Sequence, residues 1–346
     1  MADLVADHRF EPEIASWDHP LAEPNLEDAR IVHKLAPLAQ IPGLAGLESR
    51  YRQRFRLKSW QYMTAVTDGL FLAFAVGTAG FASNGFVYAA ELPGGKVHKK
   101  FAITPFTVGT ELAPSSVTGR HRFESRGISV AIDNEREGRR FVTRIAAGSL
   151  AGSLVFDTQP GGENEHHAIC VPLPGGRWNY THKYASFAVS GQITIDGRRI
   201  DFAPGRSFGT MDFTKMYALR HAVWRWIAIC GKSRQGATIG LNLVDPTPVA
   251  PISENAAWID GRYEPIVNVR LGVDPDAANG WTATADSVDL TMRAVAQVEQ
   301  KLDLPLVRHR LRHVVGAFSG HVRTASGHVH DLDSVVGIAE DYDTWW

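Results

Sequence analysis

Cysteine is nearly absent from this sequence, which has only Cys170 and Cys230 among its 346 residues. A disulfide scaffold is therefore excluded, and reduced thiols in a reducing compartment are expected. The segment 1–10 carries acidic residues and lacks the basic start and apolar run of a secretory signal. These absences together predict a cytoplasmic protein.

An excess of charge of either sign is also lacking, because 36 Lys and Arg stand against 37 Asp and Glu, a formal net charge of -1. No overall positive field would hold a polyanion, so a nucleic-acid partner is not expected. The sequence has no phosphate-loop glycine pattern before Gly231-Lys232-Ser233, no dinucleotide fingerprint and no Gly-x-Ser-x-Gly elbow. Nucleotide-dependent chemistry is therefore not expected, and no cofactor is predicted.

One long uncharged stretch, Gly69–Ala90, has about the length of a membrane span. However, it contains several glycines and polar residues, and Ser83-Asn84-Gly85 is a turn signal between two β-rich runs. The stretch is predicted to be a buried pair of strands, so no integral membrane span is expected.

Turn residues are abundant, with 32 Gly and 18 Pro. From Tyr51 onwards, short β-rich runs alternate with turn signals, as in Ile128–Asp133 and Arg140–Ile145 on either side of Asn134–Gly138. Val288–Leu304, the best helical candidate, also alternates and is interpreted as a strand. Regular spacing of this kind predicts an all-β sandwich or barrel.

The chain is long enough for two domains that each bury a core. Residues 1–48, rich in Pro and acidic residues, are predicted to form an N-terminal arm, with Leu26–Leu35 as one helix. Residues 49–205 and 206–346 are predicted to form one meandering barrel each. The two closed sheets would enclose an apolar cavity.

The segment Trp178–Tyr184 holds the first candidate site residues. On a strand, Asn179 and Lys183 share one face with Thr181, while Tyr180 points to the other face. A lysine among aromatic and polar groups suits an anionic or carbonyl group of a ligand. The alternative is a surface strand with Lys183 in solvent.

Asp212 follows a strand of small and apolar residues. Desolvation there would raise the pKa of its carboxyl towards neutrality, which suits a general acid or base. The alternative is a carboxylate that caps a turn or pairs with an arginine. Trp224 and Trp226 lie two apart, so both indoles face one side and could stabilise a cationic intermediate, or simply fill a barrel. Asn242, within an apolar strand, needs a partner if buried, and a ligand is one option.

The histidines do not predict a metal site. His309 and His313 are surrounded by arginines that would repel a cation, and His328 and His330 have no further ligand cluster nearby. No metal ligand is therefore assigned.

The sequence resembles a family known as domain of unknown function 2804. The resemblance rests on five stretches: Arg56–Tyr62, which includes Trp60, then Asn179–Lys183, Met211–Phe213, Trp224–Trp226 and Val336–Asp341.

More distantly, the sequence is similar to the carotenoid 1,2-hydratase (hydroxyneurosporene synthase) group and to lipocalin-like pericyclases. Their order of a strand with an Asp-Gly turn, an Asp-bearing strand and a Trp-x-Trp strand is matched by Gly191–Gly197, Gly209–Asp212 and Trp224–Trp226. The resemblance implies two tandem lipocalin-like antiparallel β-barrels with an apolar pocket, and it carries over Asp212 as the one acidic position. Phe213 and Thr214 follow here, where the hydratase pattern has an acidic residue and a Trp.

The first functional hypothesis is a cofactor-free enzyme that hydrates, isomerises or cyclises a hydrophobic small molecule such as an isoprenoid, polyketide or lipid. Asp212 and Lys183 are its catalytic candidates, and the substrate-binding candidates are Trp60, Asn179, Tyr180, Trp224, Trp226 and Asn242. The alternatives are a carrier for a lipophilic ligand, in which no acid needs a perturbed pKa, and a structural role, which a cavity below roughly 300 Å³ would favour. Assembly into a homo-oligomer is left open.

Overall fold

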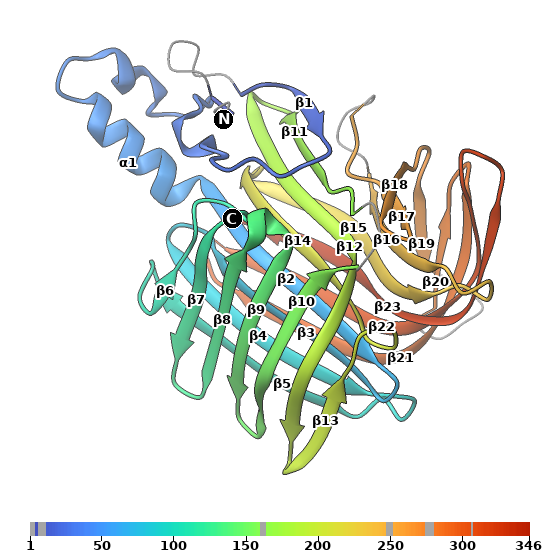
Figure 1. Ribbon diagram of the computed structural model, residues 1–346. Coiled ribbons are helices and arrows are strands. Elements are labelled where there is room, and N and C mark those ends of the chain that lie inside the picture. The colour runs from blue at the N-terminus through green and yellow to red at the C-terminus, as the bar shows by residue number, and fades with distance from the viewer. Residues whose placement is uncertain (1–3, 6–11, 160–163, 247–251, 274–279, 306) are drawn as a thin grey trace.

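Two curled antiparallel β-sheets make up the protein in the computed structural model, which describes all residues except 1–3, 6–11, 160–163, 247–251, 274–279 and 306 (Figure 1). Among the described residues, β1–β14 form the first sheet and β15–β23 the second. The prediction of an all-β protein of two lipocalin-like antiparallel units is confirmed.

The first sheet runs in the order β5-β4-β3-β2-β14-β12-β10-β9-β8-β7-β6; β11 and β13 also pair with β12, and β1 pairs with β11. Its strands are β1 (Ala15–Trp17), β2 (Leu57–Thr67), β3 (Leu70–Thr78), β4 (Ala82–Glu91), β5 (Val97–Pro105), β6 (Thr110–Glu111), β7 (Gly119–Ser125), β8 (Ile128–Glu135), β9 (Arg140–Ala147), β10 (Leu150–Thr158), β11 (His167–Leu173), β12 (Arg177–Ile195), β13 (Arg198–Phe202) and β14 (Phe208–Tyr217).

The second sheet runs in the order β18-β17-β16-β15-β23-β22-β21-β20-β19. Its strands are β15 (His221–Lys232), β16 (Thr238–Asp245), β17 (Ala256–Ile259), β18 (Arg262–Pro265), β19 (Arg270–Val273), β20 (Trp281–Thr284), β21 (Val288–Asp303), β22 (Arg308–Arg323) and β23 (Val329–Trp345). The strand β21 confirms the strand interpretation of Val288–Leu304.

The N-terminal region differs from its prediction. Leu26–Leu35 is not one helix; the short 3-10 helices η1 (Leu26–Asp28) and η2 (Ala36–Gln40) form instead, while η3 (Arg136–Gly138) lies in the β8–β9 turn. Strand-like alternation from Tyr51 is also overridden, because the helix α1 (Ala45–Phe55) continues to Phe55. Tertiary contacts hold α1: the Arg52 guanidinium pairs with Glu48 one turn earlier and donates to the Tyr217 hydroxyl on β14, 2.9 Å away.

The uncharged stretch Gly69–Ala90 forms the buried pair β3 and β4, as predicted. The turn lies earlier than Ser83-Asn84-Gly85, which belongs to β4. It falls at Ala79–Phe81, where Gly80 has a φ of +84° and leaves room for the Arg54 carbonyl. In the part of the chain that the structure describes, no helix has the length and apolar character needed to cross a membrane.

Each sheet curls around its own packed core. Phe74, Phe156 and Phe187 belong to the core of the first sheet, and Ile229, Leu241 and Phe318 to that of the second. A third apolar cluster joins the outer faces of the two sheets, with Tyr62 and Tyr88 from the first sheet and Trp226, Val315 and Ile338 from the second. The sequence predicted a cavity inside the closed sheets, and this placement is wrong. The cores fill the space that each sheet encloses, and the cavity lies between the two sheets.

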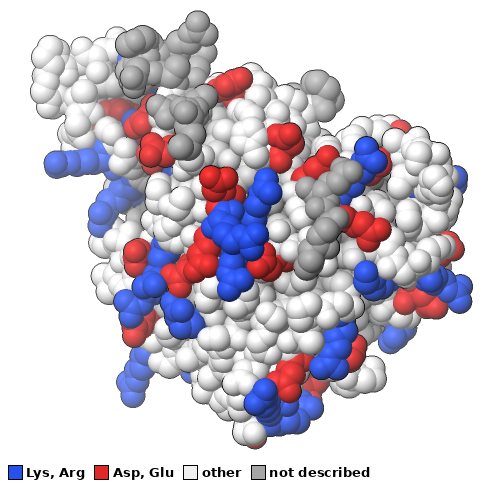
Figure 2. All heavy atoms as spheres, viewed as in Figure 1, with Lys and Arg blue, Asp and Glu red and all other residues white. Residues whose placement is uncertain are grey.

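The chain passes from the first sheet to the second between Tyr217 and His221. The predicted boundary between residues 205 and 206 precedes β14, which pairs with β2 and β12 of the first sheet. The division into folding domains stays a prediction. On the face shown in Figure 2, basic and acidic side chains lie intermixed, in keeping with the balanced net charge.

Candidate functional site

The candidate site is a cavity of about 510 Å³ between the outer faces of the two sheets. Apolar side chains of both sheets form most of its wall, among them Phe81, Phe86, Val244, Leu311 and Tyr342. The volume lies within the range of small-molecule pockets, and predominantly apolar walls with a few polar groups are typical of them. A purely structural role, which a filled interface would have indicated, is not favoured.

A polar row crosses the first sheet at this cavity. Strand register places Asp212 of β14 between Lys183 of β12 and Tyr62 of β2. Because side chains alternate along a strand, Met211 and Phe213 point into the core while Asp212 faces the cavity. The predicted separation of Asn179 and Lys183 from Tyr180 follows the same rule.

Asp212 is held by several donors at once. The Lys183 ammonium lies 2.7 Å from Asp212 Oδ1 and 3.0 Å from Glu254 Oε2. The Trp60 indole N–H donates to Asp212 Oδ2 at 3.0 Å, and the Thr214 hydroxyl donates to Oδ1 at 2.9 Å. Lys183, Asp212, Thr214 and Glu254 are buried and Trp60 is partly buried, so the carboxylate is oriented within a low-dielectric setting.

Lys183 stays a cation in this arrangement. Burial alone would lower its pKa, but the carboxylates of Asp212 and Glu254 oppose that effect, and the pKa is raised above its ordinary value. The ammonium is thus shared between two carboxylates, and the side chain is buried rather than in solvent.

A second polar row crosses the second sheet and faces the first. Strand register places Glu340 of β23 between Trp226 of β15 and His313 of β22. Glu340 Oε2 lies 2.5 Å from His313 Nε2, and Glu340 Oε1 accepts a hydrogen bond from the Trp224 indole at 2.6 Å. Each sheet therefore contributes one carboxylate that is fixed by an indole N–H.

The two rows are linked through aromatic side chains. The Tyr88 hydroxyl of the first sheet lies 2.9 Å from His313 Nδ1, and the Tyr62 and Tyr88 hydroxyls lie 3.4 Å apart. Burial is the main reason why the pKa of Tyr62 is raised well above its usual value, and the charges of Glu340 and Asp212 add to it. Tyr62, Tyr88, His313 and Glu340 thus form a hydrogen-bonded chain that spans both sheets.

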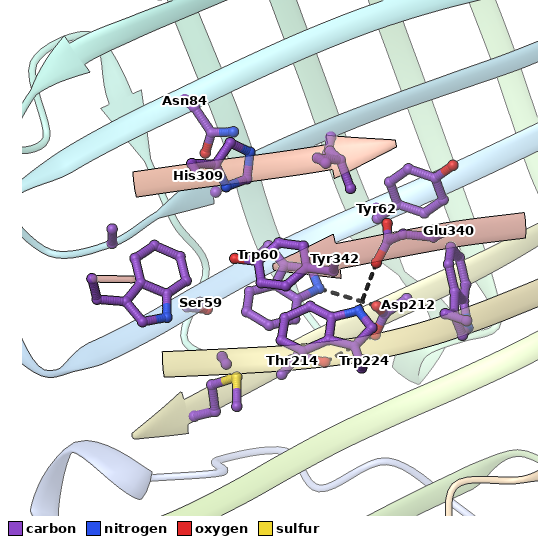
Figure 3. A pocket seen from close by; sticks show the side chains of 18 of the residues that line it. Ser59, Trp60, Tyr62, Asn84, Asp212, Thr214, Trp224, His309, Glu340 and Tyr342 are labelled. Carbon is purple, nitrogen blue, oxygen red and sulfur yellow. Dashed lines mark hydrogen bonds between the residues drawn. The ribbon is translucent and has the colours of Figure 1, made fainter. Parts of the chain in front are cut away.

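Stacked rings form the wall between the two carboxylates. The Trp60 and Trp224 ring centroids lie 6.4 Å apart at 18°, and the Trp224 and Tyr342 centroids 3.6 Å apart at 9°. Figure 3 shows these three rings side by side, with hydrogen bonds from the two indoles to Asp212 and Glu340. Electron-rich ring faces in such a position attract positive charge.

Most of the predicted site residues meet at this cavity. Its lining includes Trp60, Asn179, Lys183, Asp212, Trp224 and Trp226. Tyr180 lies in the core of the first sheet, where its hydroxyl accepts a hydrogen bond from the Leu21 N–H. Asn242 lies behind the wall; it accepts from the Trp226 indole at 2.8 Å and donates to the Glu254 carbonyl. Asn242 therefore holds two wall residues in place.

Sequence reasoning missed Glu254, His313 and Glu340. Glu340 lies in the last stretch that carries the family resemblance, Val336–Asp341, but nothing in that stretch marks it out from its acidic neighbour. From the sequence, His313 is considered only as a metal ligand, and it is rejected because the arginines beside it would repel a cation. In the structure those arginines lie on the face of β22 opposite to His313, because successive side chains of a strand point to opposite faces. His313 is buried against Tyr88. Among the described residues, no group of three or more His, Cys, Asp or Glu side chains is arranged to hold a metal ion.

The fold and the cavity define a β-protein of lipocalin-like architecture with two indole-fixed carboxylates facing one apolar space. The chain belongs to the family described as domain of unknown function (DUF2804), which it matches over residues 35–346. No curated protein matches the sequence.

Two solved structures are similar over most of their length. A protein assigned as AttH from Nitrosomonas europaea is 16% identical with a TM-score of 0.46, and the match covers 83% of this chain and 92% of that one. Kievitone hydratase from Nectria haematococca is 10% identical with a TM-score of 0.49, covering 95% of this chain and 97% of that one. Likenesses of this strength carry no argument about activity.

Proposed function

We propose that this protein is an enzyme that moves protons on a hydrophobic small molecule bound between the two sheets, without a cofactor. Hydration, isomerisation or cyclisation of an isoprenoid, polyketide or similar lipid is the reaction class. The observation that supports this proposal is the pair of carboxylates, the buried Asp212 and the partly buried Glu340, that face one apolar cavity from opposite sheets.

The two carboxylates have different partners and therefore suit different roles. Asp212 accepts hydrogen bonds from Trp60 and Thr214 and pairs with a lysine that stays charged, which suits a base or a stabiliser of positive charge. Glu340 and His313 lie close enough to share one proton, which suits a general acid. Proton transfer from Glu340 and His313 to an unsaturated bond would leave positive charge beside the stacked Trp60 and Trp224 rings.

Exclusion of bulk water is the further contribution of the cavity. Any water molecule that reached a cationic intermediate would react with it. An apolar enclosure limits which water molecules have access to the intermediate. In a hydration, Asp212 would take the proton of the single attacking water; in an isomerisation or cyclisation it would take a proton of the substrate. A carrier protein, by contrast, needs the apolar cavity but neither fixed carboxylate.

Deuterium incorporation tests the proposal and does not require the substrate to be identified first. The purified protein is incubated in D₂O with a cellular lipid extract, and mass spectrometry follows compounds that gain deuterium or heavy water. The wild-type protein is expected to label at least one hydrophobic compound. The Asp212→Asn variant is expected to lose about 100-fold or more of that rate, because a positioned acid or base contributes 10²–10⁴-fold.

The control is Asp333→Asn, which removes an exposed carboxylate of the second sheet and should label at the wild-type rate. Full activity in Asp212→Asn would remove Asp212 from the mechanism. A wild-type protein that retains a lipid through purification yet labels nothing would indicate a carrier.

A further inference from the structure

Where β4 faces β22, polar side chains line the cavity without a role in the proposed chemistry. The two strands meet at the hydrogen bond of 2.9 Å between the Tyr88 hydroxyl and His313 Nδ1. Asn84 lies four residues before Tyr88 on β4, and His309 lies four residues before His313 on β22. Both side chains line the cavity, and Figure 3 shows them at the same end of it. An amide and an imidazole are thus brought together from opposite sheets.

A second amide reaches this end of the cavity from β21. In the register of β21 and β22, Leu302 is opposite His309 and Gln300 is opposite Leu311. All four residues line the cavity, so Gln300 is the diagonal neighbour of His309 on one face of the sheet. Asn84, Gln300 and His309 together form an amide–imidazole group.

The amide–imidazole group has unused hydrogen-bonding capacity. Gln300 Nε2 is buried without a partner. His309 Nδ1 lies 2.9 Å from the Thr344 hydroxyl, but among the described residues neither His309 Nε2 nor the Asn84 amide has a hydrogen-bond partner. Unsatisfied buried polar groups are rare in folded proteins, and a ligand in the cavity is one way to satisfy them.

The imidazole of this group is uncharged at neutral pH. Burial lowers the pKa of His309, the Glu340 carboxylate partly opposes that shift, and His313 adds to it. An uncharged imidazole keeps one nitrogen that accepts a hydrogen bond, which a protonated ring lacks. His309 can therefore accept a hydrogen bond from a ligand.

The charged side chains of the cavity wall do not favour an anion. Among the described lining residues, Lys183 is the one lysine or arginine, and it already pairs with Asp212 and Glu254. Glu340 is the third carboxylate in the wall, and it pairs with His313. A carboxylate or phosphate of a ligand would meet three acidic groups and no free cation.

We propose that the amide–imidazole group binds a hydroxyl group of an uncharged, largely apolar ligand. A hydroxyl can accept a hydrogen bond from Gln300 Nε2 and donate its proton to His309 Nε2 or to the Asn84 carbonyl oxygen. A hydrocarbon would leave these groups unsatisfied, and an ionised carboxylate has no proton to donate. The substrate class narrows from a lipid in general to an apolar alcohol.

The strand β22 also relates the hydroxyl to the proposed chemistry. His309 and His313 are four residues apart, a separation of roughly 13 Å along the strand. Because His313 contacts Glu340, a ligand held by its hydroxyl at His309 would present a bond at about that distance to the carboxylate. The identity of the reacting bond rests on the proposed function, whereas hydroxyl binding does not.

Eight-carbon ligands that differ only in their head group test this proposal, with the full chain at pH 8. The change in tryptophan fluorescence reports binding, since Trp60, Trp224 and Trp346 line the cavity. A hydroxyl buried without a partner would make octan-1-ol bind at least about tenfold more weakly than octane. The wild-type protein is instead expected to bind octan-1-ol at least as tightly as octane, and more tightly than octanoate or octylammonium.

The variant His309→Leu is expected to bind octan-1-ol at least about threefold more weakly, because one hydrogen bond to the hydroxyl is lost, while the affinity for octane does not fall. Asn84→Leu should act in the same direction. The control His321→Leu removes a histidine of the same strand that does not line the cavity, and both affinities should stay within twofold.

Tighter binding of octane, octanoate or octylammonium than of octan-1-ol by the wild-type protein would overturn the proposal, as would failure to bind octan-1-ol. This comparison does not depend on how any variant folds. An unchanged ratio of the octan-1-ol and octane affinities in both His309→Leu and Asn84→Leu would overturn it as well.

The Asp212→Asn variant separates this inference from the proposed function, because it should keep the ratio of the two affinities within twofold. Hydroxyl binding that survives beside a failed deuterium experiment would reject the enzyme alone. Deuterium labelling that depends on Asp212, without any preference for octan-1-ol, would reject this subsite alone.

Discussion

At the scale of single residues, Lys183 is the group on which the site most depends. Its ammonium separates Asp212 from Glu254, and all three side chains are buried. Removing one partner of a buried ion pair leaves an uncompensated charge, which is far more costly than losing an exposed pair.

Lys183→Met is therefore expected to lower the free energy of unfolding by about 3–5 kcal/mol at pH 8, measured by urea denaturation. The loss should be smaller at pH 5, because the two carboxylates left without their cation can take up protons. The control Lys301→Met breaks an exposed pair with Glu299 and should cost less than about 1 kcal/mol. Equal losses in the two variants would contradict the role assigned to Lys183.

The residues that alternate along strands were predictable, and those that depend on a distant partner were not. Asn179 and Lys183 could be placed opposite Tyr180 because a strand sends successive side chains to opposite faces. Glu340 and His313 become a pair only when β22 and β23 align in register, and register is a property of two strands rather than of one local sequence.

At the scale of elements, the two sheets lie in close contact where β16 crosses β12. A Cβ atom on Gly240 would lie 1.6 Å from the Ala185 carbonyl oxygen and 2.5 Å from its carbon. Both contacts are with backbone, so no flexible side chain can move aside. Because Gly240 has no side chain, the two sheets can pack this closely beside Lys183.

Gly240→Ala is expected to push the sheets apart and to destabilise the protein by at least about 1–3 kcal/mol, the usual cost of overpacking. Chemical denaturation measures the stability, and binding of a long-chain alcohol, followed by quenching of the fluorescence of the cavity tryptophans, measures whether the cavity has changed shape. The control is Gly69→Ala, where an added Cβ meets nothing within 4 Å. If the two alanine variants were equally stable, the sheets would not be held as closely as described.

The same scale shows why α1 escaped prediction. The residues of α1 from Tyr51 to Phe55 follow the alternating pattern of a strand, whereas the helix is held in place by the contacts of Arg52 with Glu48 and Tyr217. Tertiary contacts of this kind override a short local pattern.

At the scale of the whole molecule, buried histidines tie stability to pH. Burial lowers the pKa of His121 and of His166 to about 3 and that of His167 to about 4, and it places the pKa of His182 well below its ordinary value. In the unfolded chain these groups would bind protons below about pH 6.5. The unfolded state then holds more protons than the folded state, so stability falls as the pH falls through this window.

The free energy of unfolding is therefore expected to decrease between pH 7.5 and pH 5.5, where ordinary carboxyl groups remain ionised. Each of these histidines adds up to about 1.4 kcal/mol per pH unit below its unfolded pKa. His121→Gln should flatten the slope, whereas His328→Gln, at an exposed position, should leave it unchanged. A slope that His121→Gln does not alter would show that this ring is accessible to protons in the folded state.

The sequence by itself determined the class of fold, the strand pair at Gly69–Ala90, the face that Asn179 and Lys183 share opposite Tyr180, and the face that Trp224 and Trp226 share. Those features follow from turn residues and from a period of two, which act over a few residues. Only the tertiary structure decided that the cavity lies between the sheets and that Glu340, His313 and Glu254 belong to it. Both faces of these strands are apolar, so local pattern cannot tell which face becomes a core and which meets a second sheet; that choice depends on contacts between residues far apart in the chain.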